Sequence, residues 1–170
     1  LIDTGNAMAR TFVLDELDSP SPGDWANYIK GVVVEFRKRG VVVPAFNAVL
    51  ESTVPMSAGM SSSAALEMSA ALAIGRLANA DLDWTEYALI GQGAENNYVG
   101  AKTGLLDQFS SLRGKAGHLV YSDFRSLTVS NVPLPEGTAL VVANSMVKHN
   151  LTNEYNERRE ACEEAVAILQ

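Results

Sequence analysis

The stretch PMSAGMSSSAALEMS, residues 55–69, enters a helix through an unusual run of small residues. Gly59 permits a positive φ and a close approach of the backbone to a ligand. The first N–H groups of a helix have no intrahelical partner and attract negative charge, so the pattern indicates a phosphate-binding turn. Core packing offers a second interpretation, in which the serines only cap the helix and the alanines allow close helix packing. Composition alone leaves both open.

Helices and strands follow one another along the chain without a regular βαβ rhythm, which predicts an α+β fold. Gly40 follows an apolar periodic segment as a helix-terminating glycine would, and Asp83 with Glu86 matches a capping box. After the serine-rich turn, residues 66, 70, 73 and 77 form one expected apolar face. We expect helices over about 25–36, 66–77, 83–97, 104–112 and 153–169, and strands over about 41–53, 118–121, 127–132 and 138–144.

Composition excludes several classes of protein. The chain has 170 residues, of which 47% are hydrophobic, so one domain with a real core is the default. A net charge of −7 disfavours binding to nucleic acid or to an anionic membrane. Cys162 is a lone cysteine, which excludes an intrachain disulfide and indicates a reducing, cytoplasmic setting. The chain begins at Leu1 without a start methionine, and we expect a central fragment of a longer protein.

Three long phrases resemble the GHMP kinases (galacto-, homoserine, mevalonate and phosphomevalonate kinases), and in particular their galactokinase branch. VPMSAGMSSSAALE at 54–67 resembles the family's nucleotide-binding motif. GQGAENNYVGAKTGLLDQFSSLRGKAGHLVYSDFRSL at 91–127 and ANSMVKHNLTNEYNERREACEEAV at 143–166 resemble the galactokinase branch in the same order. The resemblance implies ATP and Mg²⁺ as co-substrate and cofactor.

The resemblance also assigns roles to individual residues. It implies that Ser63 and Glu95 bind magnesium and that Asp107 is the catalytic carboxylate beside the anomeric hydroxyl of the sugar. Gly104 and Tyr155 would contact the same sugar. The residues placed around the ATP phosphates are Ser57, Ala58, Gly59, Met60, Ser61, Ser62 and Ser63.

Ordinary structural roles stand beside these assignments. Without the resemblance, Glu95 would be a solvated residue near a helix end, Asp107 a carboxylate complementing a helix N-terminus, and Tyr155 part of an amphipathic face. Thr103 stands where the galactokinase phrase usually has a cysteine. Because Thr103 borders the implied sugar site, the identity of the sugar stays open, with galactose as the default.

The resemblance implies a GHMP kinase N-terminal domain over 1–137, incomplete at its start, with a fold also found in a domain of a ribosomal protein. Residues 138–170 would begin the C-terminal domain. The implied activity is transfer of the ATP γ-phosphate to the sugar, by a monomer without nucleic-acid or membrane partners. The isolated chain is expected to be inactive, because the family's motifs before Leu1 and after Gln170 are absent. A non-catalytic sugar and ATP sensor with a protein partner, and an RNA-binding module, are the alternatives.

Overall fold

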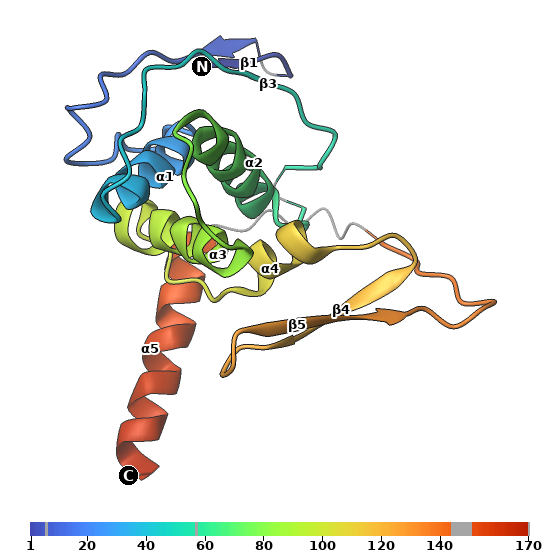
Figure 1. Cartoon of the computed structure of the whole chain (residues 1–170). Helices are drawn as coiled ribbons and strands as arrows, with labels where there is room; N and C mark the ends of the chain where they lie inside the picture. The colour runs from blue at the N-terminus through green and yellow to red at the C-terminus, as the bar shows by residue number, and fades with distance from the viewer. Residues whose placement is uncertain (6, 57, 144–150, 170) are drawn as a thin grey trace.

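Helices form the centre of the molecule (Figure 1). The structure, a computed structural model, describes residues 1–5, 7–56, 58–143 and 151–169, with the backbone alone for 151–155. The helical elements are α1 (Asn27–Lys38), α2 (Ser62–Leu77), α3 (Trp84–Gly93), the π-helix η1 (Ala94–Val99), α4 (Leu106–Arg113) and α5 (Leu151–Leu169). None of these described helices combines the length and apolar character needed to cross a bilayer. The α+β class is confirmed.

Helix α1 lies at the centre of the core, because it packs against α2, α3 and η1. Its apolar face, which includes Ile29, Val32 and Phe36, is completely buried or nearly so. The ring of Phe36 meets the ring of Tyr87 edge to face, with 6.2 Å between centroids. Burial of one such side chain stabilises a fold by about 1.5–3 kcal/mol. Gly40 ends the helix at φ +75°, as predicted.

Helix α2 is turned differently from the prediction. Ala73 and Leu77, two members of the expected face, are exposed. A Cβ added to Gly75 would lie 2.2 Å from the Tyr87 hydroxyl, so the glycine permits α3 to approach closely on that side. The rotation carries Glu67 into the core. The buried residues of α2 are Ala64, Glu67, Met68, Ala70, Ala71, Ile74 and Gly75.

A small sheet lies beside the helices, at the top of Figure 1. It comprises β1 (Ile2–Asp3), β2 (Met8–Ala9) and β3 (Val49–Leu50) in the order β2-β1-β3. β1 pairs antiparallel with β2 and parallel with β3. The predicted strand over 41–53 is therefore wrong except at β3. A strand forms only where a neighbouring strand supplies hydrogen-bond partners, and β1 pairs with only two residues of this segment. Pro44 also has no N–H to donate to such a ladder.

A hairpin and a long helix follow the core. β4 (His118–Asp123) pairs antiparallel with β5 (Thr128–Pro133), which confirms both predicted strands. Residues 138–143 form no strand and lie exposed, so that part of the prediction is wrong, and Asn144 lies outside the described residues. α5 confirms the last predicted helix and projects away from the other helices (Figure 1). Its predicted stripe of Cys162, Val166 and Leu169 is exposed.

Candidate active site

The serine-rich turn leaves the start of α2 uncapped by side chains. Ser61 occupies the N-cap position in the left-handed region, at φ +52°, and makes no side-chain capping bond. Within the described chain no hydrogen bond engages the hydroxyls of Ser62 or Ser63, so the interpretation of the serines as caps is not supported. Gly59 has φ +69° and open space where a Cβ would be. The turn thus presents free N–H groups beside an open surface.

The remaining residues of the turn are consistent with an open surface. Ala58 is partly exposed, and Met60 is 48% exposed although it is a large apolar side chain. Ser57, also predicted to bind ATP, lies outside the described residues.

Glu95 lies on a π-helix rather than on a continuous α-helix. α3 begins with the predicted capping box, in which Asp83 and Glu86 each bind the other's backbone N–H. The helix then widens into η1 and ends at Gly100, whose φ is +93°. The N–H groups of Gly100 and Ala101 both donate to the carbonyl of Glu95, at 2.8 and 3.0 Å. π-helical turns often mark functional sites, and this one places the Glu95 side chain in the interior.

The loop between η1 and α4 is held tightly at Thr103. Its carbonyl accepts hydrogen bonds from Gln92 Nε2 and Asn96 Nδ2, both at 3.2 Å. Its N–H donates to Asn96 Oδ1 at 2.8 Å, and its hydroxyl donates to Glu95 Oε2 at 2.5 Å. The side chain that replaces the family's cysteine is therefore bonded to the expected metal ligand. Gly104, the next residue, is exposed with open space at its Cα.

Gln108 joins two buried carboxyl groups. Its Nε2 lies 3.1 Å from Glu95 Oε2 and 3.3 Å from Glu67 Oε2. Gln108 and Glu67 are completely buried, and Glu95 is 4% exposed. Burial above all, and then the charge of Glu95, raise the pKa of Glu67 to about 10, although the hydrogen bond from Gln108 acts in the opposite direction. Glu67 is accordingly neutral near pH 7. The sequence predictions missed both Glu67 and Gln108; a glutamate within a run of small residues was the available signal.

Asp107 is placed where a carboxylate complements the dipole of α4, but it makes no capping hydrogen bond there. It lies in the first turn of α4, half-buried, and no side chain caps that helix. Among the described residues it makes no hydrogen bond or ion pair. Its charge contributes to the raised pKa of Glu67, after burial and the larger contribution of Glu95, so Asp107 lies close to the buried pair. A carboxylate with this freedom is available to a ligand.

Ser63 lies on the same side of α2 as the buried pair. It precedes Glu67 by four residues, and residues four apart lie one above the other on a helix face. Glu67 is in turn linked to Glu95 through Gln108, and the charge of Asp107 acts on Glu67. No group of three or more His, Cys, Asp and Glu side chains capable of holding a metal occurs in the described ranges. A hydroxyl and a carboxylate fit magnesium, which takes oxygen ligands and retains waters or phosphate oxygens.

Helix α5 contacts this region through a residue that the predictions did not name. Asn156 Oδ1 accepts from the Lys102 N–H at 2.9 Å, and its Nδ2 donates to the Gly100 carbonyl at 3.1 Å. Lys102 Nζ also reaches Glu160 at 3.2 Å. The side chain of Tyr155, the predicted sugar contact, lies outside the described residues, but its neighbour Asn156 holds the loop that leads to Gly104.

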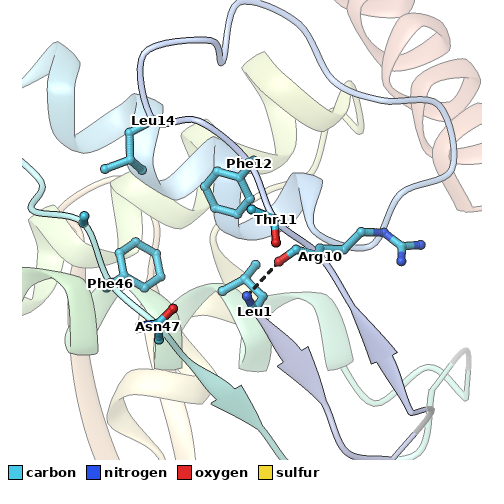
Figure 2. Close-up of a pocket in the computed structure, with 8 residues that line it drawn as sticks. Leu1, Arg10, Thr11, Phe12, Leu14, Phe46 and Asn47 are labelled. Atoms are coloured by element: carbon cyan, nitrogen blue, oxygen red, sulfur yellow. Dashed lines mark hydrogen bonds between the residues drawn. The ribbon is translucent and has the colours of Figure 1, made fainter.

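A hollow of about 120 Å³ lies elsewhere, between the N-terminal segment and residues 45–47. Figure 2 shows Phe12 and Phe46 among its lining residues, with the Leu1 amino group donating to the Arg10 carbonyl at 2.8 Å. It contains none of the predicted site residues. This hollow and the proposed chemistry are therefore separate.

Comparison with known proteins identifies the class of protein. Residues 27–115 match the GHMP kinases N terminal domain, so the chain belongs to the GHMP kinase family. Among its relatives, the galactokinase of Chloroflexus aggregans is 40% identical over 94% of this chain, and that of Glaesserella parasuis 46% over 88%. The chain spans 41% and 39% of those two proteins.

A solved structure agrees with the sequence relatives. The crystal structure of Lactococcus lactis galactokinase complexed with galactose matches with a TM-score of 0.71 and 25% identity. The match covers 94% of this chain and 43% of that one. The resemblance seen in the sequence is confirmed.

Proposed function

We propose that the full-length protein carrying this sequence transfers the γ-phosphoryl group of ATP to the anomeric hydroxyl of galactose or a closely related sugar. The observation that carries the proposal is the state of Asp107: its carboxylate is half-buried and has no partner in the described part of the chain. Phosphoryl transfer relies on positioning and charge stabilisation, with a carboxylate to orient and deprotonate the acceptor hydroxyl. The galactokinase relatives support this choice of acceptor.

Each of the other residues has a defined part in this proposal. The uncapped N-terminus of α2 and the turn from Ser57 to Ser63 would bind the ATP phosphates. Gly104 and Tyr155 would contact the sugar, on the side of the site held by Asn156. Asp107 would accept the proton of the anomeric hydroxyl as that oxygen attacks the γ-phosphorus, while ADP leaves.

Magnesium would be held by Ser63 and Glu95. The ion would neutralise charge on the phosphate oxygens. Both hydrogen bonds to the Glu95 carboxylate end on Oε2, so within the described chain Oε1 accepts none and remains available to a cation.

We further propose that residues 1–137 belong to the N-terminal domain and that 138–170 begin the C-terminal domain. The exposure of residues 138–143 and of the described side chains at 157–169 in α5 supports a boundary in this region. The single cysteine, Cys162, supports a reducing, cytosolic location. We expect a monomer that binds ATP and a sugar.

A coupled ADP-release assay on the full-length protein, across hexoses, pentoses and uronic acids, tests the proposal. We expect galactose or a close relative to give turnover that depends on both sugar and magnesium. Glu95→Gln should strongly weaken the magnesium-dependent turnover while changing Tm little. Sugar binding without ATP turnover would instead support a non-catalytic sensor, and turnover with none of the sugars would refute the proposed activity.

A further inference from the structure

We infer that Gln108 is a positioning residue: anchored on Glu67, its buried side-chain amide holds the Glu95 carboxylate in one orientation for the cation that accompanies ATP. The inference rests on the proposed function for the identity of that cation, and on geometry for the rest. Gln108 Nε2 carries two N–H groups, and two carboxyl oxygens lie within hydrogen-bond distance of it. One amide nitrogen can therefore bind both groups at once.

The neighbours of Gln108 determine which way its amide faces. If the amide were reversed, its carbonyl oxygen would lie against the Glu95 oxygen that now accepts a hydrogen bond at 3.1 Å. Two acceptors at that separation in the interior would repel one another, and Glu95 Oε2 would lose the hydrogen bond from Gln108. The observed orientation avoids this.

Packing prevents the amide from moving away. A Cβ added to Gly91 would lie 3.1 Å from Gln108 Cγ, 3.3 Å from Glu67 Oε2 and 2.2 Å from Met68 Cε. Helix α3 therefore passes directly over the pair, and a glycine at position 91 is what permits it. Gln108 is completely buried where α4 packs against α2 and α3, so its side chain has no route to solvent within the described chain.

Charge explains why the anchor is a carboxylic acid rather than a second carboxylate. Two ionised carboxylates around one amide, both removed from water, would repel strongly. Burial and the charge of Glu95 keep Glu67 neutral near pH 7, because they raise its pKa to about 10. Glu67 then accepts a hydrogen bond from Gln108 without competing for the cation.

The result is a carboxylate held from two sides. Thr103 and Gln108 both donate to Glu95 Oε2, at 2.5 and 3.1 Å. The other oxygen, Oε1, is the one left for a metal. Partners of this kind, which bind the ligand rather than the metal, typically contribute about 10- to 100-fold to metal affinity or activity.

The test uses the full-length protein, a non-hydrolysable ATP analogue and Mn²⁺, whose binding is measured by electron paramagnetic resonance. Gln108→Met keeps the length of the side chain and removes both donors. We expect the Kd for Mn²⁺ to rise about tenfold in Gln108→Met and by less than about threefold in Glu67→Gln, which retains an acceptor. Ser110→Ala, on the exposed face of the same helix, is the matched control.

The outcomes separate this inference from the proposed function. A folded Gln108→Met protein whose Kd for Mn²⁺ equals that of Ser110→Ala would overturn the positioning role, even if turnover falls, because packing alone would then explain the loss. If Gln108→Met does not fold, Gln108→Asn, too short to reach both carboxyl groups, is judged by the same criterion. A wild-type protein that binds Mn²⁺ with the analogue but phosphorylates no sugar would refute the proposed activity and leave the positioning role standing.

Discussion

The hydroxyl of Thr103 donates a 2.5 Å hydrogen bond to Oε2 of Glu95, and this bond joins the loop before α4 to the π-helix. The two residues are eight positions apart, and the loop between them turns back because Gly100 adopts a positive φ. The resemblance to galactokinases implies a cysteine at position 103, whose thiol is a weak donor. Threonine therefore supplies a stronger bond to the expected metal ligand.

Replacement of Thr103 should affect the metal more than the fold. Thr103→Val keeps the shape of the side chain and removes the donor, so we expect the magnesium concentration for half-maximal turnover to rise about tenfold. Thr103→Ser retains the hydroxyl and should stay within about threefold of wild type. An assay of turnover against magnesium concentration, with Tm measured in parallel, decides the matter. Equal magnesium dependence in the two variants would show that the bond has no functional role.

Glu67 should make stability depend on pH in a specific direction. Its pKa is about 4.5 unfolded and about 10 folded, so folding requires proton uptake between these values. Its contribution to the free energy of unfolding is complete below about pH 4.5 and decreases as the pH rises toward 10. Glu67→Gln removes this loss while keeping an acceptor for Gln108.

We therefore expect the difference in Tm between Glu67→Gln and wild type to increase as the pH rises from about 5.5 to about 8.5. Each kcal/mol of stability that the wild type loses should add about 2–4 °C to this difference. Thermal unfolding without added metal measures this difference. A difference that is constant over this range would mean that Glu67 is ionised in the folded protein.

Asp107→Asn tests the proposed base directly. Asparagine keeps the size of the side chain but cannot accept the proton, so we expect turnover to fall by about two to four orders of magnitude. ATP affinity should be nearly unchanged. Asp83→Asn is the matched control, because asparagine caps a helix about as well as aspartate and Asp83 caps α3. Turnover of Asp107→Asn within about threefold of the control would exclude the catalytic role.

Asn156 should influence the sugar through the loop that it holds. Asn156→Leu removes the partners of the Lys102 N–H and the Gly100 carbonyl, and two lost hydrogen bonds correspond to about a tenfold effect or more. We expect the KM for sugar to rise by about that factor, with the KM for ATP unchanged. Glu160→Gln, which removes only the exposed ion pair with Lys102, is the control. Parallel changes in both KM values would argue for a general loss of structure.

Gly59→Val tests the phosphate-binding turn. Valine tolerates φ +69° poorly and would fill the open space at that position, so nucleotide binding should be abolished. Gly117 has the same φ of +69° and open surroundings, and precedes β4 on another part of the chain. Gly117→Val should therefore carry similar strain and leave ATP affinity unchanged. Normal ATP affinity in folded Gly59→Val would show that the turn does not bind the phosphates.

Local patterns were sufficient for the helices, because periodicity, the Asp83 capping box and the terminating Gly40 act within a few residues. They were sufficient for the hairpin as well, since its two strands are neighbours in sequence and pair with each other. The resemblance to galactokinases, and not the local pattern, named Ser63, Glu95 and Asp107 as candidates.

Contacts between distant segments decided the rest. The strand predicted over 41–53 shrank to Val49–Leu50, because a strand depends on a partner that sequence periodicity does not describe. The buried face of α2 includes Gly75, which permits α3 to approach closely, and Glu67, which lies beside Gln108. From the neighbouring sequence alone, a glutamate at this position is expected to lie on the surface. Only the tertiary structure, by removing water from Glu67 and placing it near the charge of Glu95, makes it a neutral acid beside the proposed metal ligand.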